Sequence, residues 1–125
     1  MNRRILIIGI FVIVLLFVSA CSGSPYTKEQ RDSLALCLSE KGVKEYGAFW
    51  CPNCAKQKKL FGDSFDIIMD KGVYVECDPR GDNSMSELCI EKDVQKYPTW
   101  EFPDGKIFVG VIPLDEFTQF TECGI

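Results

Sequence analysis

Two cysteines separated by a proline and an asparagine, Cys51-Pro52-Asn53-Cys54, constrain this chain more than any other feature. The preceding residues, 43–50, are rich in aromatic and small side chains, which predicts a β-strand. Proline is favoured at the first position of a helix, so Pro52 predicts a helix that begins at the motif and ends near Gly62. Both thiols are therefore expected where a strand meets a helix, on one face of that helix.

The rest of the pattern predicts one α/β domain over residues 27–125. Thr27 and Gln30 form a capping box, which predicts a helix from about Lys28 to Lys41. Further helices are expected over 64–71, 84–92 and 114–122, and further strands over 73–77, 99–102 and 106–111. The helical crossovers predict parallel strands, and the turn before the last strand adds an antiparallel one. We therefore expect a mixed central sheet with helices on both faces.

The N-terminus has the pattern of an export signal. Arg3 and Arg4 precede an apolar run over residues 5–20. The run is shorter than the roughly 20 residues that a membrane-spanning helix usually needs. We assign residues 1–20 to a signal peptide or membrane anchor and leave both alternatives open.

The end of this run, Val18-Ser19-Ala20-Cys21, resembles the lipobox of prokaryotic lipoproteins. That resemblance implies that Cys21 is lipidated and becomes the first residue of the mature chain. Residues 21–26 would then be a short tether that holds the domain near the membrane. With or without cleavage, the domain is expected outside the cytoplasm and anchored to the cell membrane, where disulfides persist.

Composition excludes several functions. Net charge is −4, with 14 basic and 18 acidic residues, which argues against a nucleic-acid partner. The chain has seven cysteines and no histidine, so no Cys-His or Ser-His catalytic pair and no imidazole zinc ligand can form. Neither a metal nor another cofactor is expected.

The Cys-x-x-Cys motif suits disulfide exchange. Exchange needs a thiolate to attack and a second thiol to resolve the mixed disulfide. A helix N-terminus favours negative charge, so we expect Cys51 to be the exposed attacking thiol and Cys54 the buried resolving thiol. Half of a zinc site and a purely structural disulfide are the alternatives. Zinc is disfavoured because Cys77 and Cys89 are too far apart in sequence to form a second close pair.

Phe49-Trp50-Cys51-Pro52-Asn53-Cys54 resembles the active site of the thioredoxin superfamily, and Tyr97-Pro98-Thr99-Trp100 resembles its cis-proline loop. With Leu60-Phe61-Gly62, Val75-Glu76-Cys77 and Glu87-Leu88-Cys89, these motifs resemble the thioredoxin-like domain attached to bacterial vitamin K epoxide reductase homologues. The resemblance implies a thioredoxin-like fold. It also implies electron transfer from secreted protein thiols to a membrane partner that reduces quinone. Asn53 departs from the histidine that is common at its position.

The resemblance also implies individual roles. It implies a cis bond between Tyr97 and Pro98, with the Tyr97 backbone pairing with the substrate. Trp50, Tyr97 and Trp100 would form an apolar rim or belong to the core. Glu45 stands where related proteins carry a buried acid that helps deprotonate the resolving cysteine, although an exposed glutamate is an equal alternative.

The remaining cysteines are assigned from the same resemblance. Related domains carry a structural disulfide that corresponds to Cys77 and Cys89, and we expect it here. Cys37 and Cys123 are not expected to be bridged, because the first and last helices of thioredoxin folds cover opposite faces of the sheet. Cys37 is then a buried thiol, and Cys123 has no assigned state.

Together these observations predict a membrane-anchored, extracytoplasmic thiol–disulfide oxidoreductase that acts on protein thiols. Oxidation or isomerisation is favoured, with a vitamin K epoxide reductase-like membrane protein as the partner. The alternatives are a reductase for cytochrome maturation and a non-catalytic, lipid-anchored binding module whose disulfides are all structural.

Overall fold

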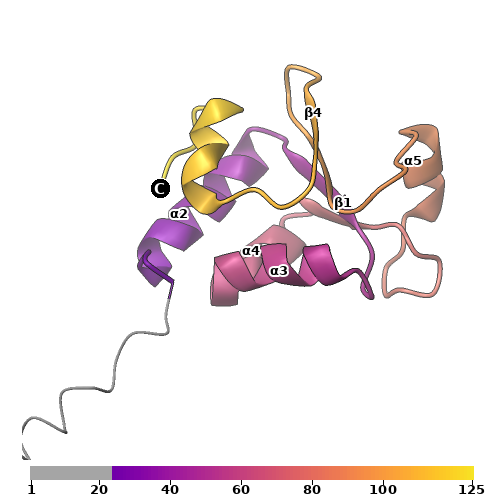
Figure 1. The fold of residues 1–125 in the computed structure, drawn as a ribbon, viewed down its shortest axis with the longest axis horizontal. Helices are drawn as coiled ribbons and strands as arrows, with labels where there is room; N and C mark the ends of the chain where they lie inside the picture. The colour runs from indigo at the N-terminus through magenta and orange to yellow at the C-terminus, as the bar shows by residue number, and fades with distance from the viewer. Residues whose placement is uncertain (1–23) are drawn as a thin grey trace, which may run out of the picture.

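The computed structural model describes residues 24–125 (Figure 1). Its helices are α2 (Lys28–Glu40), α3 (Pro52–Phe61), α4 (Phe65–Asp70) and α5 (Ser86–Glu91), with 3₁₀ turns η1 (Gly62–Ser64) and η2 (Leu114–Gln119). Its strands are β1 (Lys44–Gly47), β2 (Tyr74–Glu76), β3 (Thr99–Glu101) and β4 (Ile107–Val109). The segment over 1–20 and Cys21 lie outside the described residues. From residue 24 onward, no helix is long and apolar enough to cross a membrane.

The strands form one mixed sheet in the order β2-β1-β3-β4. β1 and β2 are parallel, whereas β3 is antiparallel to both β1 and β4. The expectation that the crossover into β3 gives a parallel strand is therefore wrong. The Cys77–Cys89 disulfide holds α5 at the carboxyl end of β2, with 5.7 Å between the two Cα atoms. The chain therefore begins β3 at the end of the sheet where β2 stops. Strand β3 then runs back in the opposite direction, antiparallel to β1.

The two faces of the sheet are covered unequally. Glu45 pairs in register with Trp100, so their side chains lie on the same face. That face carries the main core, which combines side chains from α2, α3, α4 and η2. Its buried members are Leu34, Ala35, Leu38, Val43, Phe61, Phe65, Ile68, Val73, Trp100, Phe102, Ile112, Leu114, Phe117 and Cys123. The opposite face carries a smaller cluster in which Tyr46 and Val75 pack with Cys89 of α5.

Cys37 and Cys123 form a disulfide, with 5.7 Å between their Cα atoms. The expectation that Cys37 remains a thiol is wrong because α2 and η2 contribute to the same core, on one face of the sheet. Beyond η2 the chain turns, and the Thr121 hydroxyl accepts the Cys123 N–H at 2.9 Å. This turn brings Cys123 to α2, where an ion pair between Lys41 and Glu122 (2.8 Å) makes a further contact. Figure 1 shows the two segments side by side.

Each disulfide should stabilise the domain, and the one that closes the longer loop should stabilise it more. Replacing Cys37 and Cys123 with alanine is expected to lower the unfolding free energy by about 4–5 kcal/mol, because their sequence separation is 86. The same change at Cys77 and Cys89, separated by 12, should cost about 3 kcal/mol. Urea unfolding followed by circular dichroism measures both. A larger loss for the second pair, or free thiols at 37 and 123 in the non-reduced protein, would contradict this.

Candidate active site

The two thiols of the Cys-x-x-Cys motif are held by the start of α3. Cys51 is the N-cap residue, and Pro52 occupies the first helical position as predicted. The Cys54 N–H donates a hydrogen bond to the Cys51 sulfur, with an N···S distance of 3.1 Å. An N-terminal backbone donor and the positive end of the helix dipole both favour negative charge on that sulfur. Both cysteines are free, whereas the described cysteines elsewhere are in disulfides.

Cys51 is less accessible than predicted. The residue is 5% exposed, and Cys54 is 7% exposed. Ala48, at the end of the strand segment, and Tyr97 pack against the two thiols and cover them. The expectation that Cys51 is exposed is therefore wrong, whereas the expected burial of Cys54 is confirmed. Tyr97 thus forms an edge beside the two thiols.

The loop before β3 completes this edge. The Tyr97–Pro98 peptide bond is cis. The Tyr97 ring meets the Trp50 ring edge-on, with 6.0 Å between the centroids. Trp50 is half exposed, whereas Trp100 is fully buried in the main core. Of the three aromatic residues considered for the rim, Trp50 and Tyr97 thus lie beside the thiols, and Trp100 does not.

Glu45 is fully buried on β1, two residues before Gly47. A Cβ atom at Gly47 would lie 3.0 Å from the Cys54 sulfur, so this strand passes directly beside the resolving thiol. Loss of solvation raises the pKa of Glu45 to about 8. Burial also raises the pKa of Cys54, and the hydrogen bond with Cys51 and the nearby Glu45 add to that effect. The Cys54 thiol is therefore a weaker acid than usual, and the Glu45 carboxyl group exchanges its proton close to neutral pH and not near pH 4.5.

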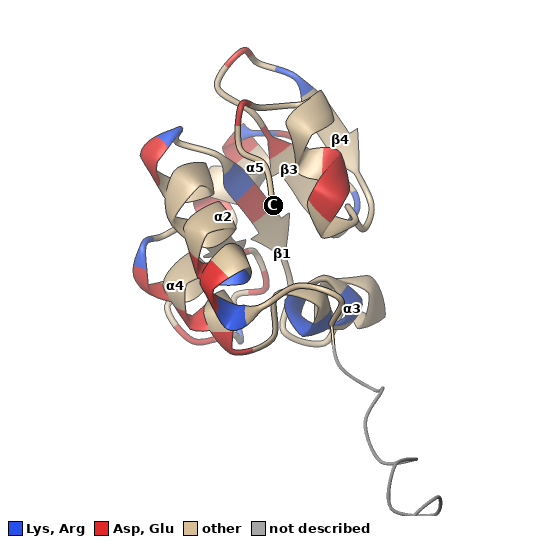
Figure 2. Ribbon diagram, turned by 90° about the vertical axis from the view of Figure 1, so that its left-hand side faces the viewer, with Lys and Arg blue, Asp and Glu red and all other residues tan. Residues whose placement is uncertain are grey.

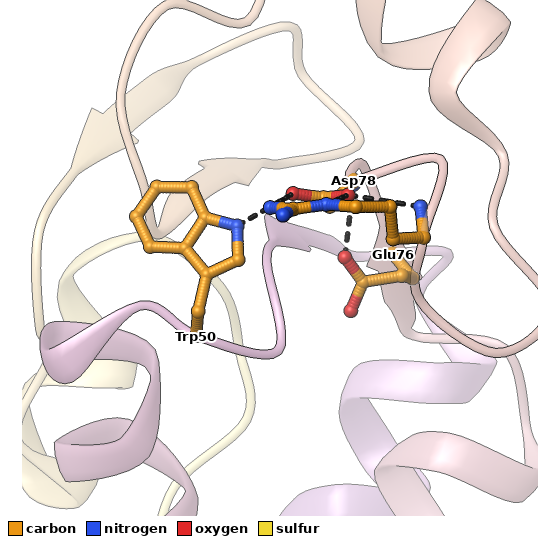
Figure 3. A network of polar contacts seen from close by, with 4 residues as sticks. Trp50, Glu76 and Asp78 are labelled. Atoms are coloured by element: carbon orange, nitrogen blue, oxygen red, sulfur yellow. Dashed lines mark hydrogen bonds and ion pairs between the residues drawn. The ribbon is translucent and has the colours of Figure 1, made fainter.

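The loop after β2 contains site residues that sequence analysis missed. Asp78 accepts a hydrogen bond from the Trp50 indole N–H at 2.6 Å and two from the Arg80 guanidinium at 3.0 and 2.8 Å (Figure 3). The bonds from Arg80 hold the pKa of Asp78 well below its usual range. Arg80 also lies over the Phe49 ring, 5.8 Å from its centroid. This loop thus fixes the exposed Phe49 and Trp50 next to Cys51. The sequence predicts only a polar loop here and does not indicate the contacts of Asp78 and Arg80 with Trp50 and Phe49.

No metal centre is apparent in the part of the chain that the structure describes. No cluster of three or more Cys, His, Asp or Glu side chains there could hold an ion. The sulfurs of Cys77 and Cys89 are bonded to each other, so they cannot complete a four-cysteine site with the motif.

A four-stranded mixed sheet, a Cys-x-x-Cys motif at a helix N-terminus and an adjacent cis-proline fit a thioredoxin-like fold. The chain is similar to Thiol-disulfide oxidoreductase LTO1 of Arabidopsis thaliana, with 36% identity over 103 residues. The match includes 80% of this chain and spans 25% of the length of that protein. No family model matches the chain.

The burial of Glu45 predicts a pH dependence of stability. The folded carboxyl has a pKa of about 8, against 4.5 for the ordinary group, so the folded state holds a proton that the unfolded state releases. Stability contributed by the protonated form is therefore complete below about pH 4.5 and falls as pH rises toward 8, by several kcal/mol in total.

Glu45→Gln should remove this dependence, because an amide does not titrate. Urea unfolding of the oxidised protein, in which Cys51 and Cys54 do not titrate, is the measurement. The stability of Glu45→Gln relative to the unsubstituted protein should increase between pH 5 and pH 8. A constant difference over that range would show that Glu45 is already charged in the fold.

Proposed function

We propose that the protein is a thiol–disulfide oxidoreductase that exchanges disulfides with protein thiols through Cys51 and Cys54. The observation that carries this proposal is the position of the Cys51 sulfur at the start of α3. It accepts the Cys54 N–H there, and its partner thiol is three residues away. Similarity to a curated thiol–disulfide oxidoreductase supports the same activity.

The reaction proceeds in two displacements. In the reductive direction, the Cys51 thiolate attacks a substrate disulfide, one substrate sulfur leaves as a thiolate, and a mixed disulfide forms. Cys54 then loses its proton and attacks the Cys51 sulfur. The bond between Cys51 and the substrate breaks, and the second substrate thiolate leaves. The cysteine pair has lost two electrons and the substrate has gained them. Substrate oxidation is the reverse sequence.

Glu45 is the proposed proton acceptor for the second displacement. Its carboxyl group is near enough to Cys54 to raise the pKa of that thiol, and its own pKa of about 8 is close to the pH at which it would work. Because its environment is apolar, the carboxylate is a stronger base than it would be in water. The proton taken from Cys54 has to leave the interior before the next cycle.

We further propose that the domain works outside the cytoplasm and is anchored to the membrane through its N-terminal segment. The apolar run over 5–20, the lipobox-like sequence that ends at Cys21 and the disulfides Cys37–Cys123 and Cys77–Cys89 support an oxidising location. The resemblance to domains attached to vitamin K epoxide reductase homologues favours such a membrane protein as the partner that reoxidises the Cys51–Cys54 pair.

Two serine variants test the roles of the thiols. Cys51→Ser should abolish insulin reduction, because it removes the first nucleophile. Cys54→Ser should instead accumulate a mixed disulfide, which non-reducing electrophoresis and mass spectrometry detect. Lys59→Ser, at an exposed position of the same helix, is the matched control and should retain turnover. If the unsubstituted protein itself does not reduce insulin, the chain is better described as a binding module.

The reduction potential of the Cys51–Cys54 pair tests the direction. We expect a value above about −200 mV in equilibration with glutathione buffers, which suits disulfide formation or isomerisation. A value near about −270 mV would make the protein a reductant. In that case the function would be reduction of disulfides for cytochrome maturation and not oxidation. The partner would then be a membrane protein that donates electrons and not one linked to quinone.

A further inference from the structure

The proton that Glu45 takes up has few routes from the protein interior to solvent. Its carboxyl group is fully buried, and neither oxygen has a hydrogen-bond partner among the described residues. On β3 the residue in register with it is Trp100, and on β2 it is Tyr74. An indole N–H can donate but cannot accept, so it cannot pass a proton on, whereas a phenol hydroxyl does both. Of the two cross-strand neighbours, only Tyr74 is able to relay a proton.

Tyr74 also reaches the resolving thiol. A Cβ atom placed on Gly47 would lie 2.8 Å from the Tyr74 ring, 3.2 Å from its hydroxyl and 3.0 Å from the Cys54 sulfur. The hydroxyl and the sulfur thus flank the same point over β1, and both approach it this closely because residue 47 has no Cβ atom. Burial and the hydrogen bond with Glu76 raise the pKa of Tyr74, so the phenol stays protonated and available as a donor.

The hydroxyl of Tyr74 is hydrogen-bonded to the carboxyl group of Glu76. It donates to Glu76 Oε2 at 3.0 Å, while Glu76 Oε1 accepts the backbone N–H of Asp78 at 2.9 Å. Glu76 is therefore held in a fixed position at the end of β2 (Figure 3).

A surface pocket of about 470 Å³ connects these groups to solvent. Cys54, Tyr74 and Glu76 line it together with the exposed Lys58 and Asp82. Its other lining residues are Ala48, Phe49, Ala55, Phe65 and Met69. The charged groups that face Tyr74 are therefore Glu76 from β2, Lys58 from α3, Asp82 from the following loop and the buried Glu45 from β1. Lys58 and Asp82 lie in water and are screened, which leaves Glu76 as the carboxylate bonded to the hydroxyl.

We propose that Tyr74 and Glu76 form the proton route between the buried Cys54–Glu45 pair and the solvent-filled pocket. The inference rests on the proposed function and adds two residues to it. When Cys54 attacks the mixed disulfide, its S–H bond breaks and the proton passes to Glu45. The Tyr74 oxygen then takes that proton as its own O–H proton moves to the Glu76 carboxylate, which releases it to water. Charge is conserved at each transfer, and the reverse direction returns the proton along the same groups.

A single-turnover experiment on the full chain tests the route. Reduced protein is mixed with an equimolar aromatic disulfide whose thiolate product absorbs visible light. A first, concentration-dependent phase reports attack by Cys51, and a second, concentration-independent phase reports resolution by Cys54. Tyr74→Phe keeps the ring, which packs edge-on against Phe65 at 5.9 Å, and removes only the hydroxyl.

Tyr74→Phe should slow the second phase at least about a hundredfold near neutral pH, the lower end of what proton transfer contributes to a rate. The first phase should not change. The loss should disappear at alkaline pH, where hydroxide can remove the proton. Glu76→Gln, which cannot take up a proton, should give the same pattern. Tyr26→Phe, on a tyrosine that packs against the main core away from the thiols, is the matched control and should leave both phases unchanged.

Unchanged second-phase rates and pH profiles in Tyr74→Phe would overturn the route. If Tyr74→Phe does not fold, Glu76→Gln decides by the same criterion. Equal slowing of both phases would also overturn it, since that pattern indicates a general disturbance of the site. The unsubstituted protein is measured first. If it shows no second phase, the proposed function fails, whereas a normal second phase that the variants do not alter removes only the route.

Discussion

The hydrogen bond from the Cys54 N–H to the Cys51 sulfur is the contact on which the site depends. It places one sulfur at the positive end of α3 and the other a single helical turn away, so the two thiols are different although they share one motif. Cys51 has a backbone donor and a helix dipole to stabilise a thiolate. Cys54 lies against the interior, where burial raises the pKa of its thiol. One turn of helix thus gives the two thiols the different surroundings that the proposed attacking and resolving roles require.

Strand β1 supplies the other half of the chemistry because its side chains alternate between the two faces of the sheet. Glu45 and Gly47 both face the α3 side of the sheet. Glu45 provides a carboxyl group there, and Gly47, which has no side chain, leaves room for Cys54 and Tyr74. Tyr46 points to the α5 side, where it packs with Cys89 and donates to Glu101 at 2.6 Å. A strand of four residues therefore joins the redox centre to the packing of both faces.

The two disulfides hold the surrounding framework on either side of the site. Cys77–Cys89 fixes α5 and the loop whose Asp78 and Arg80 position the exposed Trp50 and Phe49, as Figure 3 shows for Trp50 and Asp78. Cys37–Cys123 joins α2 to the C-terminal segment across the main core. Among the helices, α2 carries both acidic and basic residues, and α4 and α5 carry acidic ones only, whereas α3 carries basic residues and no acidic ones (Figure 2). The helix that bears the thiols thus has a local positive charge in an otherwise acidic chain.

The sequence by itself determined the features that depend on neighbouring residues. These include the capping box at Thr27, the helix that begins at Pro52 and the strand that precedes it, since each is set by side chains a few positions apart. The resemblance to known domains also pointed to the Cys77–Cys89 pairing and to the cis bond before Pro98, both of which the structure contains. Only the tertiary structure decided the direction of β3, the cover over Cys51, the Cys37–Cys123 bridge and the meeting of Glu45 with Tyr74 and Trp100. Each of these joins residues far apart in the chain, and their contact depends on how whole elements pack, which no local pattern encodes.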